Sequence, residues 1–436
     1  MLIFAVIMVL AQADGGVSSP QAASNVSIHG ALEGQVEAMP SGPSGGGYDG
    51  FISLRPVFGL NVGESFAAEL GPLFRFRLID SAPEQRSEDF GTVLRRRDWD
   101  QASDFGQLIS VLRIAPESSP FYVRAGPVRK KTFGLGHLIN RYSNQENPDY
   151  HPASATAVLA LGPIRAEFFD SDLFGARIFA GELAWDLGRT FSSSAEVFDR
   201  YVVSLQLVHD AAFAGQPPDG RLNFTALQQL TMLQIDGSIV LVRNESLRFM
   251  AMAGIGSRFN LEANLGFLVG LALDANVKEI SFSVKLEGRK QAGGFRQGMF
   301  GPTYELSRFA GLGLTGAPIA QERLPDAFSL YAEGRARVGE LVTVDAMAEY
   351  FTFGRTDLDS TVSVSVLKHW LVMNARFTAV GLGVQPRYAV TAGMRLRLFS
   401  SFYVLASGGT IFFPQADGTL NRGVTAAAGV GVDFER

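Results

Sequence analysis

A strict alternation of apolar and polar residues limits how this chain can fold more than any other feature. From Ile280 to Leu286 every second residue is a large hydrophobe. Ser281, Ser283 and Lys285 occupy the positions between them. Because successive side chains of a strand point to opposite sides, this segment is predicted to form a ribbon with one apolar face and one polar face.

Segments of this kind recur from residue 24 to the end of the chain, and nineteen of them can be delimited, among them 155–169, 225–243 and 361–369. Many are as long as the ~9–11 residues that a tilted strand needs to cross a bilayer. Outside the first ten residues, no apolar run approaches the ~18 residues of a membrane helix. A soluble sandwich also alternates, but ordinary strands average about 5–6 residues. The pattern therefore predicts an all-β fold: a single closed antiparallel transmembrane β-barrel with short periplasmic turns and long extracellular loops.

The number of strands is constrained by where the chain begins and ends. If both termini lie in the periplasm, the number must be even, so one of the nineteen segments is wrong. Counted inward from each end, the up-and-down order breaks between Leu187 and Leu230, where the segment 225–243 is long for one strand. We therefore predict about 18 strands, within a range of about 16–20.

The N-terminal residues resemble an export signal. Leu2 to Leu10 is an uninterrupted apolar run, and the small-x-small triplet 11–13 follows it. This predicts a signal peptide over 1–13, a periplasmic lead-in over 14–23 and a barrel over 24–436, in the outer membrane of a Gram-negative bacterium. The absence of cysteine suits an oxidising periplasm. The formal net charge of −5 argues against a nucleic-acid partner.

The end of the chain carries a resemblance to a known class. Val430-Gly431-Val432-Asp433-Phe434 alternates and ends in an aromatic residue, followed by Glu435 and Arg436. It resembles the C-terminal signature of Gram-negative outer-membrane proteins, and the whole layout is similar to porin-like bacterial outer-membrane β-barrels. The resemblance implies that Phe434 is an assembly signal for the barrel-assembly machinery, and that outer-membrane lipid and lipopolysaccharide surround the protein.

If the hydrophobes face lipid, the alternate residues face the lumen. The predicted pore-lining set is mostly basic: Arg75, Arg77, Arg124, Arg165, Lys285, Arg289, Glu333, Arg335, Arg337, Asp345, Glu349, Arg376, Arg395 and Arg397. Guanidinium groups around water raise the local concentration of anions, which favours an anion-selective pore. Equally, arginine and glutamate on neighbouring strands can pair and brace the wall. The segments 333–337 and 395–397 are the candidate constriction.

Three connections contain unusual residues. The segment 134–151 could hold a metal through His137, Asp149 and His151, bind a sugar through Tyr142 and Tyr150, or pack as a loop over the pore. The mixed-charge segment 92–100 is interpreted as a solvated face or a site for phosphorylated lipid headgroups. The segment 292–327 contains aromatic residues and glycines, so we expect it to fold inward as a constriction.

The sequence therefore predicts an outer-membrane pore for passive or weakly selective diffusion of small, possibly anionic, solutes. The alternative is a non-conducting barrel that anchors an envelope or surface complex. The chain has no Gly-x-Ser-x-Gly nucleophile motif. We expect no catalytic site, metal or cofactor. A hydrolase at the barrel rim would depend on His137 or His151.

Overall fold

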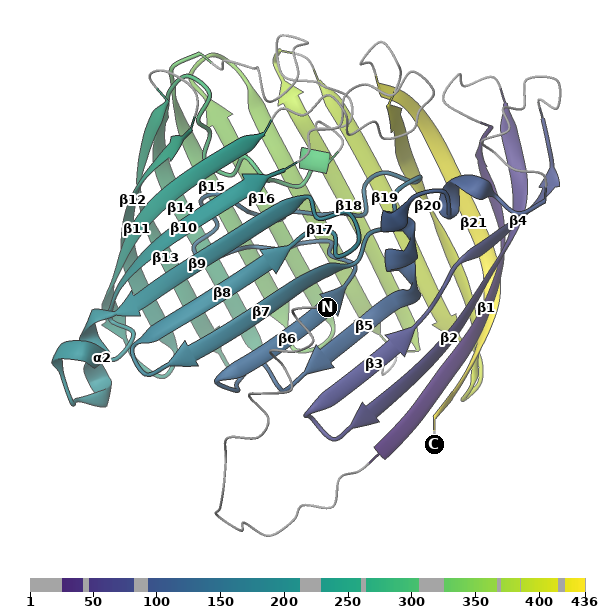
Figure 1. The fold of residues 1–436 in the computed structure, drawn as a ribbon, viewed down its shortest axis with the longest axis horizontal. Helices are drawn as coiled ribbons and strands as arrows, with labels where there is room; N and C mark the ends of the chain where they lie inside the picture. The colour runs from purple at the N-terminus through teal and green to yellow at the C-terminus, as the bar shows by residue number, and fades with distance from the viewer. Residues whose placement is uncertain are drawn as a thin grey trace.

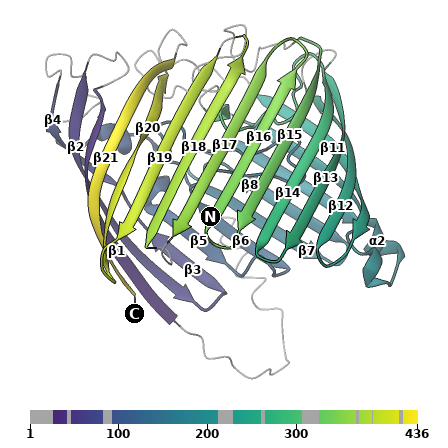
Figure 2. The same ribbon diagram turned by 180° about the vertical axis from the view of Figure 1, so that it is seen from behind.

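The computed structural model describes residues 26–41, 47–81, 93–211, 229–259, 264–305, 325–366, 370–384, 386–414 and 420–435. The predicted signal peptide 1–13 and lead-in 14–23 lie outside these residues. The described part is almost entirely β-structure, arranged as one large barrel with tilted strands (Figures 1 and 2).

The strands have between 5 and 16 residues, and few helical turns lie between them. The N-terminal half contains β1 (Val26–Pro40), β2 (Tyr48–Val62), β3 (Phe66–Leu70), β4 (Phe74–Ile79), β5 (Ile109–Ile114), β6 (Phe121–Gly126), β7 (Ser154–Leu161), β8 (Ile164–Asp170), β9 (Ile178–Asp186) and β10 (Tyr201–Asp210). The C-terminal half contains β11 (Leu230–Arg243), β12 (Leu247–Arg258), β13 (Leu265–Val277), β14 (Ile280–Gln291), β15 (Ala327–Val338), β16 (Val342–Phe351), β17 (Thr356–Val366), β18 (Leu371–Leu382), β19 (Arg387–Arg397), β20 (Phe402–Pro414) and β21 (Leu420–Glu435). The helical turns are η3 (Arg96–Asp98), η4 (Ala102–Leu108), α2 (Leu187–Phe191) and η5 (Ala195–Val197). No helix in these ranges is long and apolar enough to cross a membrane.

The sheet closes on itself through antiparallel pairing of β1 with β21. Every other strand pairs with its sequence neighbours, except where β3 and β4 both pair with β2 and β3 continues to β5. Gly71-Pro72-Leu73 separates β3 from β4, and a proline cannot donate to the ladder, so one strand position is interrupted there. The 21 strands therefore fill the 20 positions of a closed antiparallel barrel, an even number within the predicted range.

The location predicted for the parity error, between Leu187 and Leu230, is wrong. The segment β11 is one strand of 14 residues. The missed strand lies in 155–169, which contains β7, a two-residue turn at Gly162-Pro163, and β8. Gly162 has φ +58, a conformation that glycine adopts without strain, and that a tight hairpin turn can require.

The two faces of the barrel differ as the alternation predicts. Exposed hydrophobes such as Val284, Leu286, Leu330, Val390 and Val432 occupy the outer face. On the same strands, the alternate polar positions point inward. The outer surface thus matches lipid, and closure leaves no unpaired sheet edge in the apolar layer.

The two rims also differ. Seven connections at one rim have two to four residues, whereas four connections at the other rim have 19 residues or more. Both rims are seen in Figures 1 and 2. The C-terminus lies at the short-turn rim, which also carries α2 (Figure 1). In an outer-membrane barrel the short turns face the periplasm, so we name this rim periplasmic and the opposite rim extracellular.

Candidate functional site: the lumen and its inward-folded loops

The connection between β6 and β7, residues 127–153, is packed inside the barrel. We call it the lumen loop. Phe133, Leu138, Ile139 and Tyr142 are almost completely buried, and they form one cluster with inward-facing residues of β8 to β11. This cluster includes Phe169, Ile178, Val208, Leu230 and Met232. The lumen loop and the inner wall therefore share a hydrophobic core inside a barrel that is otherwise lined with polar residues.

A second inward segment covers the lumen loop. Residues 292–305, which follow β14, place Phe295, Phe300 and Tyr304 in the same cluster. The Asn140 amide donates to the Phe300 carbonyl at 3.1 Å, and the Phe300 amide donates to the Leu138 carbonyl at 3.1 Å. The described part of 292–327 therefore folds inward as the sequence predicts, while residues 306–324 lie outside the described ranges.

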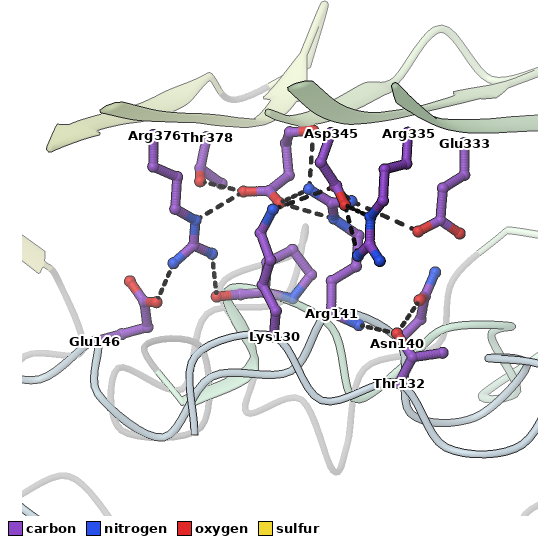
Figure 3. Close-up of polar contacts among 12 residues, drawn as sticks. Lys130, Thr132, Asn140, Arg141, Glu146, Glu333, Arg335, Asp345, Arg376 and Thr378 are labelled. Carbon is purple, nitrogen blue, oxygen red and sulfur yellow. Dashed lines mark hydrogen bonds and ion pairs between the residues drawn. The ribbon is translucent and has the colours of Figure 1, made fainter. Parts of the chain in front are cut away.

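Arg141 fixes the lumen loop to the opposite wall (Figure 3). Its Nε and Nη2 donate to Asp359 Oδ2 of β17 at 2.8 and 2.6 Å, and its Nη1 donates to Asp345 of β16. Arg141 has a backbone φ of +57, a conformation that residues other than glycine seldom adopt. The buried guanidinium with two carboxylates is a strong, charge-assisted contact that compensates for this backbone.

Two further ion pairs of the lumen loop lie beside Arg141 (Figure 3). Lys130 Nζ is 3.2 Å from Asp345 Oδ1. Glu146 accepts from Arg376 Nη1 of β18 at 2.5 Å, and Arg376 Nε donates to Asp359 Oδ1 at 2.9 Å. The loop therefore crosses the barrel from β6 and reaches β18 at Arg376.

His137 is a second attachment of the same loop. It is fully buried, with Nδ1 2.7 Å from Asp236 Oδ1 of β11 and Nε2 3.1 Å from Glu287 Oε1 of β14. A carboxylate only accepts hydrogen bonds, so both nitrogens donate when the imidazole is protonated. Burial alone would lower the pKa of His137, but the hydrogen bonds that it donates to Asp236 and Glu287 more than offset this effect and raise the pKa.

The raised pKa predicts an alkaline loosening of the loop. A group with a raised pKa contributes its stabilisation fully below its unfolded value of about 6.5 and loses it as pH rises through the folded value. We expect amide hydrogen exchange of residues 134–140 to quicken more steeply with alkaline pH than intrinsic chemistry requires. In His137→Gln the excess pH dependence should vanish; an identical profile in both proteins would contradict this assignment.

Charged residues of the β4–β5 connection are also folded inward. Arg95, Arg97 and Asp98 are buried, so the interpretation of 92–100 as a solvated face or a headgroup site is wrong for these three residues, whereas Arg96 is exposed. Both arginines bond to Asp149. Burial would raise the pKa of Asp98, but Arg75 and Arg95 hold it well below its usual range.

The metal and sugar hypotheses for 134–151 do not fit this geometry. His137 bonds to wall carboxylates, whereas Asp149 bonds to Arg95 and Arg97 and His151 Nε2 lies 3.3 Å from Asp98. Tyr142 and Tyr150 are buried, so they present no surface to a sugar. The third interpretation, a packed loop over the pore, describes what the structure contains. No group of three or more potential metal ligands occurs in the described ranges.

The predicted pore-lining residues fall into two groups. The recessed residues are paired: Arg75 with Glu37 and Asp98, Arg77 with Asp49, Lys285 with Glu287 and Glu333, Arg289 with Glu287 and Glu349, Asp345 with Lys130 and Arg141, and Arg376 with Glu146 and Asp359. Nearer the periplasmic rim, Arg165 pairs with Glu167, Arg335 with Asp345, and Arg395 and Arg397 with Asp433, whereas Arg124 and Arg337 are exposed. Whether this second group lines an open pore stays a prediction.

Several residues of the lumen network were not predicted. Asp236, Asp357 and Asp359 supply wall carboxylates to His137, Arg296 and Arg141. The two β17 residues were missed because that strand was predicted to begin at 361. Thr356-Asp357-Leu358-Asp359 does alternate, but Leu358 is the only large hydrophobe there. Phe434 was predicted as an assembly signal, and it points outward and is exposed.

The inward loops cover only part of the wall. From β8 to β17, inward residues such as Gln206, Gln234, Glu287 and Tyr331 are buried. Beyond Arg376, inward-facing Asn374, Thr391 and Ser407 of β18, β19 and β20 are exposed. We call the wall of β18 to β20 the open sector.

A closed antiparallel barrel with an apolar exterior, a polar interior, short turns at one rim and long loops at the other defines a porin-like outer-membrane β-barrel. This chain belongs to that architectural class.

The sequence matches no protein-family model and no curated protein. Among solved structures it is similar to OpdK of Pseudomonas aeruginosa (8% identity, TM-score 0.37), over 94% of this chain and 99% of that one. It is also similar to the ferric enterobactin receptor PfeA of the same species, with 9% identity and a TM-score of 0.38, over 95% of this chain and 81% of that one. CdiB of Acinetobacter baumannii matches with 8% identity and a TM-score of 0.29 over 93% of this chain. The chain spans 60% of the length of CdiB. Likeness at this level carries no argument about solute or partner.

Proposed function

We propose that this protein is a channel for passive diffusion of small anionic solutes across the outer membrane. The observation that carries the proposal is the one-sided filling of the lumen. The lumen loop and residues 292–305 cover much of the inner face of β8 to β17 and leave its periplasmic ends exposed. On the open sector, the side chains of Asn374, Thr391 and Ser407 are exposed as well. Water and small solutes would pass between the edge of the loop and this wall, as in a pore narrowed by a loop.

The preference for anions rests on the charges that water can reach. In the periplasmic half, Arg165, Arg335 and Arg395 have side chains that are 46%, 55% and 43% exposed. The acids beside them are recessed, since Asp345 is 7% exposed and Asp433 is 25% exposed. Exposed guanidinium groups over buried carboxylates leave a positive potential on the water side of the wall.

A non-conducting anchor is the second candidate. The dense packing of the lumen loop favours it, because a barrel that serves only as a scaffold has no need of a passage. On that view a subunit of an envelope complex would close the open sector.

Planar-bilayer recording with the purified protein distinguishes the two. A channel gives stable current steps, and in a KCl gradient its reversal potential shifts toward that of chloride. Replacing Arg335 and Arg337 together with glutamine should shift the reversal potential back toward zero, because two exposed charges are lost. The matched control makes the same change at Arg189, which lies in the β9–β10 connection, and at Arg243, which donates to the Phe198 carbonyl of that connection. The absence of steps would favour the anchor.

Export by residues 1–13, contact with lipid and lipopolysaccharide, and recognition of Phe434 by the barrel-assembly machinery belong to the same proposal. The outward, exposed position of Phe434 beside the closing seam of β1 and β21 supports the last of these.

A further inference from the structure

A row of polar side chains follows the hydrogen-bond register of the inner wall from β14 to β20. Six inward-facing polar residues are partners in this register from one strand to the next. They are Ser281, Arg337, Thr343, Ser363, Asn374 and Ser407. On β19 the position between Asn374 and Ser407 is held by Gly393, which has no side chain. We call this row the polar track. All six are partly or fully exposed.

The polar track climbs the barrel. Strands of a closed barrel tilt, so a row that runs across the strands rises along the barrel axis. Arg337 is the residue before the last of β15, beside the periplasmic turn that follows. Ser407 is the sixth residue of β20, well away from its periplasmic end at Phe402. The track therefore leads from the periplasmic mouth up into the open sector.

The side chains of the track are free, unlike those of the covered wall. None of the six makes a side-chain hydrogen bond or ion pair with another residue of the described ranges, and none has a buried unpartnered atom. On the covered wall, by contrast, Gln206, Gln234 and Glu287 all bond to neighbouring side chains. A line of unengaged donors and acceptors facing the lumen exchanges hydrogen bonds with water or with a solute.

We propose that the polar track makes the channel favour small polyhydroxylated carboxylates, such as sugar acids. This inference rests on the proposed channel function and names its solute class. Hydroxyl and amide groups at successive strand spacings can replace water around the hydroxyls of a solute, which lowers the cost of partly dehydrating it in a narrow passage. The guanidinium of Arg337 has no carboxylate partner in the described ranges, so it is available to the carboxylate of the solute.

Bi-ionic reversal potentials test the track. The probes are potassium gluconate and the potassium salt of 2-(N-morpholino)ethanesulfonate, an anion of similar size without hydroxyls. We expect the native channel to favour gluconate. The combined Ser363→Ala, Asn374→Ala and Ser407→Ala substitutions should lower gluconate permeability about tenfold, the effect of losing one to two net hydrogen bonds. Permeability of the sulfonate should stay within about twofold. The matched control is Ser360→Ala, which makes the same change on the lipid face of β17.

The role of Arg337 is tested separately by liposome swelling. Arg337→Gln should slow swelling in gluconate and leave swelling in glucose unchanged. Equal effects on both solutes would overturn the assignment of Arg337 to the carboxylate. Equal effects of the three combined substitutions on gluconate and the sulfonate would overturn the track while leaving the channel intact. A correctly folded protein that gives no current, with folding checked by heat-dependent gel mobility, would overturn both the track and the channel.

Discussion

Replacing Arg141 with alanine is expected to loosen the lumen loop beside β16 and β17 and to raise the single-channel conductance. The guanidinium joins the loop to Asp345 and Asp359 across the barrel, and all three side chains are buried. Removing one partner of a buried ion pair costs about 3–5 kcal/mol. We expect the lower end of that range, because Asp345 keeps Arg335 and Asp359 keeps Arg376. The loop keeps its buried hydrophobic cluster, His137 and the ion pairs of Lys130 and Glu146, so we expect only the stretch around Arg141 to move away from β16 and β17.

Planar-bilayer recording measures this effect, and Arg129→Ala is the matched control. Arg129 lies on the same loop, but it is exposed and no ion pair of it occurs in the described ranges. Its removal should leave the conductance unchanged. If Arg141→Ala and Arg129→Ala conduct alike, the ion pairs of Arg141 do not hold the loop against the wall.

Introducing arginine at Leu286 is expected to destabilise the barrel by about 2–4 kcal/mol, the cost of placing this charge at the lipid-facing midplane. Leu286 lies near the middle of β14, points outward and is 49% exposed. Ser283→Arg on the same strand is the control, because Ser283 faces the water-filled side. Its effect should be small, although it adds a charge opposite Arg335.

Urea unfolding in lipid vesicles, followed by tryptophan fluorescence, gives the free energy of unfolding of each of the two variants and of the native protein. Equal losses in the two variants would contradict the orientation of β14, and with it the assignment of the apolar face to lipid. The same strand carried the clearest alternation in the sequence, so it is the most direct place to test this orientation.

The strands were predictable because their signal is local. In β14 and β19 the apolar or polar character of each residue indicates the side of the sheet on which it lies, without information from distant contacts. The turn at Gly162-Pro163 was missed for a physical reason. The strands that it joins have eight and seven residues, so together they look like one long strand. A glycine followed by proline is nevertheless a strong turn signal, even where the hydrophobicity continues on both sides of it.

The lumen network was not predictable in the same way. The chain separates Arg141 from Asp345 by 204 residues, and His137 from Glu287 by 150. Periodicity shows that a carboxylate faces inward, but it does not show which loop will reach it. The sequence therefore identified 134–151 as unusual and left open whether it binds a ligand or packs against the wall.

These long separations also set an order for biogenesis. The lumen loop is synthesised early, whereas Asp345 and Asp359, the residues that lock it, belong to β16 and β17 near the end of the chain. Closing contacts over such intervals carries a loop-closure cost and slows folding. The loop can therefore lock only after β16 and β17 have joined the barrel, so a barrel without these strands would hold a loose, protease-sensitive interior.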